Sequence, residues 1–297
     1  MRGCKESMNK KLYFPKVAII GVGLIGGSLA IALKEKKLCG SIAGVGRGPK
    51  NLKAAKRLGL IDSFTTDIKE GVKGADLVVV AVPVLSILRV IKEALPNLKK
   101  GCIVTDAGSV KDAIVRGVEK VMPDGVFFVA GHPIAGTENS GAGAAVQGLF
   151  KGRKCILTPT PRTDKRALKQ VKKLWEAAGS DVVFMAPKKH DKVLAAVSHL
   201  PHVVAYTLVN TVSDMEKKGG GLVKYSAGGF KDFTRVASSS PAMWRDVCGM
   251  NKDAIVKVME AFEKRLGKLK SLIKKGELSK IEKTFERAKR VRDSIKR

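Results

Sequence analysis

A glycine-rich turn after an apolar run is the feature that most restricts the fold of this chain. The motif Gly21-Val-Gly23-Leu-Ile-Gly26 directly follows the apolar residues 17–20 and opens a stretch with helical spacing. Gly21 permits a tight turn, Gly23 lets backbone N–H groups approach a phosphate, and Gly26 lets the helix pack closely on the strand. A strand, such a turn and a helix predict a dinucleotide-binding unit. The residues predicted to contact the cofactor here are Gly21, Gly23, Leu24, Ile25 and Gly26.

Short β-branched runs alternate with helical stretches over the first two thirds of the chain. The predicted strands are residues 16–20, 41–45, 76–82, 101–106, 127–131, 154–158 and 181–185, and the predicted helices are 26–37, 50–58, 86–95, 111–121 and 164–178. From Asp191 onward the pattern is helical only, interrupted by glycines at 219–221 and 228–229. We therefore expect an α/β, doubly wound (Rossmann-like) nucleotide-binding domain over residues 1–187 and an all-helical second domain over residues 188–297.

Composition indicates a folded and strongly basic protein. The 56 Lys and Arg residues against 27 Asp and Glu give a formal charge of +29, and 44% of the 297 residues are hydrophobic, which excludes general disorder. The longest uninterrupted apolar run is less than half of the about 20 residues that a membrane helix needs, and the first residues lack the apolar segment of a secretory signal. The five scattered cysteines form no CxxC pair. We expect a cytoplasmic protein with no metal site and no membrane span.

The end of the second predicted strand indicates which dinucleotide is bound. An NAD-preferring site carries an acidic residue about 20 residues after the glycine motif, but no Asp or Glu occurs between Lys36 and Ile61. Arg47 stands there instead, where its side chain could hold a 2′-phosphate, stack on adenine or point into solvent. We predict that NADP is preferred over NAD, and that Val82, which ends the third predicted strand, and Pro83, which follows it, also line the cofactor site.

Two segments at predicted strand ends carry the candidate catalytic groups. Ligands of such sheets bind beyond the carboxyl ends of the strands, where the sequence places Thr105-Asp106-Ala-Gly-Ser109-Val-Lys111 and Gly131-His132-Pro133. A dehydrogenase needs a base of near-neutral pKa, and of the four histidines only His132 ends a predicted core strand. Ser109 could hydrogen-bond that imidazole or a substrate hydroxyl, and it could also cap the helix that begins near Val110.

Several motifs together resemble the prephenate/arogenate dehydrogenase family of tyrosine biosynthesis. They are Gly21-Val-Gly-Leu-Ile-Gly-Gly-Ser28, Asp106-Ala-Gly-Ser-Val-Lys111, Gly131-His-Pro-Ile-Ala-Gly-Thr-Glu138, Ser198-His-Leu-Pro-His202, and Phe230-Lys-Asp-Phe-Thr-Arg235 with Pro241-Ala-Met-Trp244. The resemblance implies that the ring carbinol of prephenate, a dicarboxylate, is oxidised by hydride transfer to NAD(P), with loss of the ring carboxylate as CO₂. It also implies a homodimer built by the helical domain. The choice between prephenate and arogenate stays open.

The resemblance also implies roles for single residues. His132 accepts the proton of the ring hydroxyl, Ser109 orients it, and Arg235 pairs with a substrate carboxylate. A solvated surface charge is the competing interpretation of Arg235 in so basic a chain. Trp244 either walls the pocket or belongs to the helical core.

The remaining histidines and one loop complete the set of candidates. His199 and His202 lie three residues apart on one predicted helical face, and we expect His199 to contact the substrate. His190, beside Asp191, is expected to serve the cap of its helix. Thr137 and Glu138 either hydrogen-bond near the substrate or shape their loop.

Two other function classes remain as alternatives. A dehydrogenase of the β-hydroxyacid or imine reductase type would share the glycine motif but place a Lys or Ser elsewhere as the acid. A non-catalytic nucleotide sensor would have no use for His132 and Arg235 together.

Residues 264–297 hold 14 Lys or Arg against 4 Asp or Glu, a local charge of +10, among apolar residues at helical spacing. We interpret this tail as a solvated helix face that covers a dimer or domain interface, and not as a nucleic-acid or membrane surface.

Overall fold

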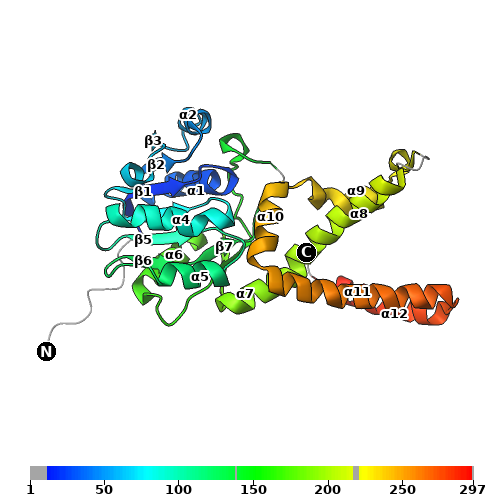
Figure 1. Cartoon of the computed structure of the whole chain (residues 1–297). Helices are drawn as coiled ribbons and strands as arrows, with labels where there is room; N and C mark the ends of the chain where they lie inside the picture. Colours follow the sequence, from blue (N-terminus) through cyan, green and yellow to red (C-terminus); the bar gives the residue numbers. More distant parts are fainter. Residues whose placement is uncertain (1–11, 138, 217–220, 296–297) are drawn as a thin grey trace.

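Six parallel strands form the sheet of the N-terminal domain (Figure 1). The computed structural model describes residues 12–137, 139–216 and 221–295. The strands are β1 (Phe14–Ile20), β2 (Cys39–Val45), β3 (Ser63–Thr65), β4 (Leu77–Val80), β5 (Ile103–Asp106) and β6 (Phe127–Val129), in the order β3-β2-β1-β4-β5-β6. The order reverses between β1 and β4, and ligands of such sheets bind at this switch point, beyond the carboxyl ends of the strands. The expected doubly wound fold is confirmed.

Helices cover both faces of this sheet. They are α1 (Leu24–Glu35), α2 (Pro49–Arg57), α3 (Ile68–Val72), α4 (Val84–Ala94), α5 (Asp112–Glu119) and α6 (Lys165–Ala177). Alternate residues of β1 enter two separate buried clusters, because successive side chains of a strand point to opposite faces. Ile19 packs with Leu29 of α1 on one face, and Ile20 packs with Ile87 of α4 on the other. Both faces of the sheet are therefore buried, as the continuous apolar strand pattern predicts.

A second, three-stranded sheet corrects one detail of the prediction. It consists of β7 (Gly131–Pro133), β8 (Lys154–Leu157) and β9 (Asp181–Phe184), with β7 antiparallel to β8. The predicted strand 127–131 ends at Val129, so His132 lies inside β7 and does not end a strand of the parallel sheet. The chain leaves that sheet because the Ala130 carbonyl accepts from the Thr158 N–H and the Gly131 N–H donates to the Asp106 carboxylate.

The second domain is helical. Its elements are α7 (Pro187–Leu194), a π-helical turn (Ala195–His199), α8 (Leu200–Glu216), α9 (Gly228–Thr234), α10 (Pro241–Met250), α11 (Lys252–Lys274) and α12 (Leu278–Asp293). Short 3₁₀ turns lie at Leu222–Tyr225 and Arg235–Ser238 in this domain, and at Leu95–Asn97 and Ala142–Ala144 in the N-terminal domain. Trp244 and Val247 of α10 belong to the same buried cluster as Ile87 of α4. The helical domain thus shares one core with the sheet, while α8, α11 and α12 extend away from it (Figure 1).

The helical run Pro187–Glu216 is longer and more apolar than the sequence analysis recognised. By length and composition alone it could cross a membrane, with a mean hydropathy of 1.3 over its most apolar window, of which 22% is buried. Counting only uninterrupted apolar runs missed it, because polar residues divide the pattern. Its buried side chains include His190, Asp191 and His199, and its remaining apolar surface is open in a single chain.

Candidate active site

The glycine turn has the geometry that its sequence predicts. Gly21 adopts a φ of 96°, and a Cβ there would lie 2.3 Å from the Ala81 carbonyl oxygen. A Cβ on Gly26 would lie 2.2 Å from the Gly21 carbonyl oxygen, whereas one on Gly23 would meet nothing within 4 Å. The N-cap of α1 is Gly23, which has no side chain to cap the helix. The first N–H groups of α1 are therefore available to an anion beside Gly23, and this turn fits the pyrophosphate of a dinucleotide.

A loop from far along the chain braces this turn, a contact that was not predicted from the sequence. The Asn51 side-chain amide donates to the Val22 carbonyl (2.8 Å), and its oxygen accepts from the Ala142 N–H (2.8 Å). Ser28 accepts from the Val146 N–H (2.9 Å). A buried Ser on the helix of the glycine motif was the only sequence signal for such a contact.

The other predicted cofactor residues lie on neighbouring loops of the same sheet edge. Arg47 follows β2 and is exposed, and within the described part of the chain it has no hydrogen-bond or ion-pair partner. Val82 follows β4 and is half-buried, with its Cγ1 3.1 Å from where a Cβ on Gly21 would lie. Pro83 is exposed and precedes the first residue of α4. The structure thus brings the predicted cofactor residues to the carboxyl ends of β1, β2 and β4.

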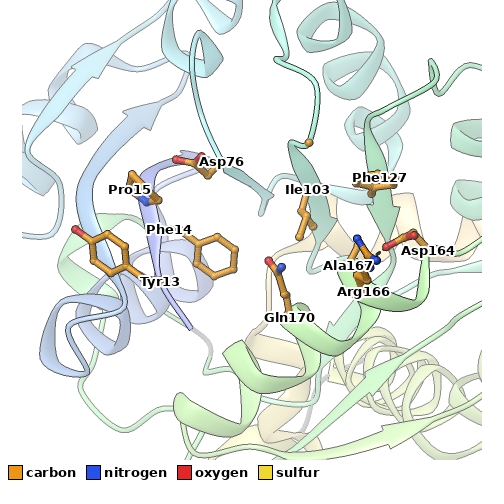
Figure 2. A pocket seen from close by; sticks show the side chains of 11 residues that line it. Tyr13, Phe14, Pro15, Asp76, Ile103, Phe127, Asp164, Arg166, Ala167 and Gln170 are labelled. Carbon is orange, nitrogen blue, oxygen red and sulfur yellow. Dashed lines mark hydrogen bonds between the residues drawn. The ribbon is translucent and has the colours of Figure 1, made fainter. Parts of the chain in front are cut away.

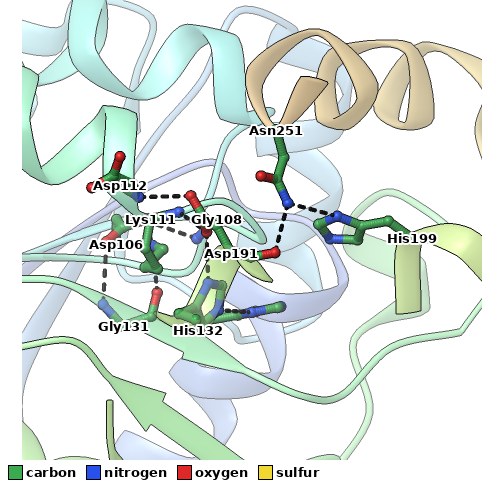
Figure 3. A network of polar contacts seen from close by, with 10 residues as sticks. Asp106, Gly108, Lys111, Asp112, Gly131, His132, Asp191, His199 and Asn251 are labelled. Atoms are coloured by element: carbon green, nitrogen blue, oxygen red, sulfur yellow. Dashed lines mark hydrogen bonds and ion pairs between the residues drawn. The ribbon is translucent and has the colours of Figure 1, made fainter. Parts of the chain in front are cut away.

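A buried ion pair organises the next part of the edge. The Lys111 ammonium and the Asp106 carboxylate form an ion pair with both side chains fully buried (Figure 3). Lys111 also donates to the Gly131 carbonyl (2.8 Å), and Asp106 accepts from the Gly108 N–H (2.9 Å) and the Gly131 N–H (3.2 Å). These contacts fix the start of β7, and with it His132, against the end of β5. Neither charge stands out in the sequence as part of a site.

Asp191 of α7 joins the two domains. Its carboxylate accepts from the backbone N–H groups of Lys111 (2.8 Å) and Asp112 (2.9 Å). It therefore caps α5, and Ser109, a candidate for that cap, does not. Burial on its own would raise the pKa of Asp191, but the hydrogen bonds from His190 and from these N–H groups outweigh it and lower that pKa.

His132 is held by a second histidine that the sequence analysis assigned to a helix cap. The His132 Nδ1 lies 2.9 Å from the His190 Nε2, and the His190 Nδ1 lies 2.8 Å from the Asp191 carboxylate. His190 is fully buried, whereas His132 is half-buried. Burial, with the nearby His190 and Lys111, holds the pKa of His132 well below its usual value, and burial also lowers that of His190 despite Asp191. The expected cap role of His190 is wrong.

The histidines of the π-helical turn and α8 meet Trp244. His199 contacts it edge-on at 5.9 Å between ring centroids, and His202 stacks on it at 3.8 Å. Burial lowers the pKa of His199 to about 4. The Asn251 amide donates to the Asp191 carbonyl (2.9 Å) and approaches the His199 Nδ1 (3.2 Å), while the buried His199 Nε2 has no partner within the described residues. Trp244 is thus both core and a support for the two histidines.

The remaining candidates are dispersed around this cluster. Arg235 follows α9 and is exposed. Burial lowers the pKa of His202, and the charge of Arg235 adds to this effect. Ser109 is half-buried between β5 and α5. Thr137 is exposed, and its hydroxyl accepts from the Asn139 N–H (3.3 Å), as a loop-shaping role predicts. Glu138 lies outside the described residues.

Cysteines and metal-type ligands add no further centre to the part of the chain that is described. No group of three His, Cys, Asp or Glu side chains within residues 12–137, 139–216 and 221–295 could hold a metal ion. Burial raises the pKa of Cys102 to about 12 and raises that of Cys155 as well, so both thiols stay protonated at neutral pH.

A cavity of about 370 Å³ lies at the opposite edge of the sheet (Figure 2). It is lined by the amino ends of β1, β5 and β6 and by the start of α6. Its carboxylates already have partners, because Asp76 accepts from the Lys16 N–H (2.8 Å) and from the Lys99 ammonium (2.5 Å), and Asp164 caps α6. The histidine cluster at the carboxyl edge is therefore the candidate site.

Comparisons with known proteins agree with this geometry. Residues 29–184 match the family model "Prephenate dehydrogenase, nucleotide-binding domain", and residues 186–287 match "Prephenate dehydrogenase, dimerization domain". The chain is 37% identical to prephenate dehydrogenase of Bacillus subtilis, over 94% of this chain and 76% of the relative. It is also 37% identical to cyclohexadienyl dehydrogenase of Zymomonas mobilis, over 95% and 97% of the two chains.

A solved structure shows the same relationship. Prephenate dehydrogenase of Aquifex aeolicus, in complex with hydroxyphenyl propionate and NAD+, superposes with a TM-score of 0.91 at 41% identity, over 97% of this chain and 100% of that one. Both domains and the fold therefore agree, and the chain belongs to the prephenate dehydrogenase family.

Proposed function

We propose that this chain oxidises prephenate or arogenate with loss of the ring carboxylate as CO₂, in the biosynthesis of tyrosine. The observation that carries the proposal is the half-buried His132, held by His190 at the same sheet edge as the open glycine turn, in a member of this family. Family membership also decides against the β-hydroxyacid and imine reductase alternative and against a nucleotide sensor.

Each candidate side chain has a chemical role in this reaction. His132 takes the proton of the ring hydroxyl, and Ser109 orients that hydroxyl by a hydrogen bond. Arg235 pairs with a substrate carboxylate, because a guanidinium binds a carboxylate with two parallel hydrogen bonds. Thr137 and Glu138, which come soon after His132 in the sequence, hydrogen-bond near the substrate. When bound at Gly21, Gly23, Leu24, Ile25, Gly26, Arg47, Val82 and Pro83, the dinucleotide supplies the hydride acceptor.

His199 acts as a hydrogen-bond donor and not as a base. Its Nδ1 faces the Asn251 amide, whose two contacts make that amide the donor, so the His199 proton resides on Nε2. Its pKa of about 4 keeps the ring neutral at physiological pH. The unpartnered Nε2–H is thus available to an oxygen atom of the substrate, with Trp244 fixing the plane of the ring.

The test of this function is a direct assay. Purified protein is mixed with prephenate or arogenate and with NAD+ or NADP+, and the absorbance of the reduced cofactor is followed together with CO₂ release. We expect one CO₂ per reduced cofactor with at least one of the two substrates. Reduction without CO₂ release, or no reduction with either substrate, would overturn the proposal.

The cofactor preference is a finer proposal. We propose that NADP is favoured over NAD, because Arg47 is exposed beside the open turn and no carboxylate lies between residues 36 and 61 to bind ribose hydroxyls. Arg47→Gln is expected to lower the NADP/NAD ratio of kcat/KM about 10-fold or more, since charge-assisted hydrogen bonds contribute roughly 1.5–3 kcal/mol. Lys53→Gln, an equal charge change on α2, is the control. A wild-type preference for NAD would refute this proposal.

We also propose that residues 188–297 build a homodimer. The family model over residues 186–287 describes a dimerization domain, and exposed apolar side chains on α11 and α12 include Leu266, Ile273 and Phe285. Light scattering is expected to give twice the mass of one chain, and Leu266→Glu is expected to shift it towards the monomer, unlike Lys268→Glu. A monomeric wild type would contradict the proposal.

We also propose a cytoplasmic location, as suits a biosynthetic enzyme whose described cysteines are free thiols.

A further inference from the structure

The buried pair His190 and Asp191 contacts His132 through the His132 Nδ1. We infer that His190 and Asp191 are positioning residues, which fix the tautomer of His132 so that its Nε2 is the base, and which hold the proton that His132 receives. The inference rests on the proposed function for the identity of the reaction. Its geometry is independent of that function, because it follows from three side chains in contact (Figure 3).

The direction of each hydrogen bond follows from Asp191. Its carboxylate accepts from the Lys111 N–H and the Asp112 N–H, as well as from His190, so it is an acceptor in every contact. The proton of neutral His190 therefore resides on Nδ1, which leaves its Nε2 as an acceptor. The His132 Nδ1, 2.9 Å away, must then carry a proton and donate it to His190. The His132 Nε2 is left without a proton, which is the form that a general base requires.

Without His190, this tautomer would not be fixed. A neutral imidazole has one donor and one acceptor nitrogen, and the bond made by one nitrogen decides the state of the other. A His132 ring without an acceptor at Nδ1 would also carry its proton on Nε2, where it cannot take another. The hydrogen-bonded series His132–His190–Asp191, called the relay below, therefore sets the fraction of enzyme molecules in which the His132 Nε2 is free to accept a proton. It does not only orient the ring.

The relay also provides a place for the transferred proton. When the ring carbinol is oxidised, the hydrogen of its C–H bond would leave with the bonding electron pair as hydride, which a dinucleotide at the glycine turn would accept, and the O–H proton moves to the His132 Nε2. The His132 Nδ1 proton can then shift to the His190 Nε2, which makes His190 a cation beside the Asp191 carboxylate. Loss of CO₂ delivers the electron pair of the C–COO⁻ bond to the ring and converts the ring carbonyl into a phenolate oxygen. The phenolate takes the proton back by the reverse path, so no net proton is released.

The surrounding charges favour a cation at this position. The charged and titratable groups that face the two rings are Asp191, Lys111, Asp106 and His199. Lys111 is paired with Asp106, whose negative charge opposes the effect of Lys111 on the pKa of His190, and burial holds His199 in its neutral form. The negative charge that is left is that of Asp191, in direct contact with His190. Among these groups, only Asp191 carries a charge that no other side chain pairs with. A proton on His190 is therefore stabilised by the Asp191 carboxylate.

The wild-type protein allows a direct readout without substrate. The chain has four histidines, so selective ¹⁵N-histidine labelling gives four ring systems, which single variants assign. We expect the ¹⁵N shifts of His132 and of His190 to show protonated Nδ1 and bare Nε2. A proton on the His132 Nε2 in the wild type would overturn the inference, whatever the reaction turns out to be. This result is also available if every variant fails to fold.

Two variants of His190 separate positioning from a purely structural role. In His190→Asn the amide reaches Asp191 but not His132, whereas in His190→Gln an amide oxygen can accept from the His132 Nδ1. We expect His190→Asn to lower kcat about 100-fold with less than about 3-fold change in KM, and to move the His132 proton to Nε2, as an incorrect tautomer does in other histidine bases. His190→Gln is expected to recover at least about 10-fold of the loss.

The control is Lys189→Asn, an exposed neighbour on α7, for which we expect unchanged kinetics. Equal kcat in His190→Asn and wild type would overturn the inference, and so would equal losses in the Asn and Gln variants. If the wild type oxidises neither prephenate nor arogenate, the proposed function fails while the ¹⁵N result still decides the tautomer.

Discussion

Removing the buried charge of Lys111 tests how the site is held together. Lys111 and Asp106 form a fully buried ion pair, and Lys111 also donates to the Gly131 carbonyl. Lys111→Met keeps the length of the side chain but leaves the Asp106 carboxylate with only the N–H donors of Gly108 and Gly131. Breaking a buried pair from one side costs about 3–5 kcal/mol. That is a large part of the about 5–15 kcal/mol by which a domain is stable.

The chain contains a matched control for this substitution. Lys34 pairs with Asp62 at 2.7 Å, but the two side chains are 33% and 46% exposed. Lys34→Met makes the same chemical change at the surface, where an ion pair contributes about 1 kcal/mol or less. Urea unfolding of both variants at one chain concentration compares the two losses.

A second substitution separates charge from packing. Adding Asp106→Asn to Lys111→Met removes the unpaired anion while keeping an acceptor for Gly108 and Gly131. We expect this double variant to be more stable than Lys111→Met alone. A loss in Lys111→Met no larger than in Lys34→Met, or a double variant that is less stable than the single one, would refute the reasoning.

Three further outcomes follow from the site. Arg235→Gln is expected to raise the substrate KM at least about 10-fold with little change in kcat, because it removes a contact present in both ground and transition states; a change confined to kcat would contradict this. The unfolded chain binds a proton at His199 near pH 6.5, whereas the folded chain, with a His199 pKa of about 4, does not. Stability should therefore fall as the pH drops from 6.5 towards 4, by roughly 3 kcal/mol for this group, and urea titrations of His199→Gln should show a flatter pH dependence than the wild type. Trp244→Ala is expected to lower the free energy of unfolding, measured with urea, by about 3–5 kcal/mol, because it leaves a cavity in the core that the two domains share. A loss below about 1 kcal/mol would place Trp244 at the surface.

Local patterns predicted the nucleotide domain well. The glycine turn is encoded within six residues, and its positive φ and close approaches admit no larger residue at Gly21 and Gly26. Apolar periodicity located the strands of the parallel sheet because both faces are buried. Within the parallel sheet and the helices that cover it, the short β3 and α3 were missed, since segments of three to five residues carry too little periodicity.

Contacts between distant segments explain what the sequence did not reveal. The apolar run at 127–131 resembles one strand, but a hydrogen bond from Gly131 to Asp106, 25 residues away, turns it into a second sheet. Asp191 follows His190 near a helix start, which suggests a local cap, yet it caps a helix 80 residues earlier in the chain. Lys111 resembles any surface lysine in a chain of charge +29, and only the fold shows it to be buried.

The charge surplus retains no specific role in this account. Part of it lies in the lysines that follow Arg47, beside the proposed cofactor site, and part on α12. A positive field would steer an anionic cofactor and a dicarboxylate towards the sheet edge.

The most direct test of the central claim is the kinetics of His132→Asn. The claim is that His132 takes the hydroxyl proton at a site formed by the glycine turn, the Lys111 ion pair and the helical domain. Steady-state rates are measured with saturating prephenate or arogenate, and cofactor binding is measured separately by fluorescence titration. We predict a loss of kcat of about 10²–10⁴-fold, the usual contribution of a general base, with cofactor affinity and substrate KM changed by less than about 3-fold. A kcat within 10-fold of the wild type would show that His132 is not the base.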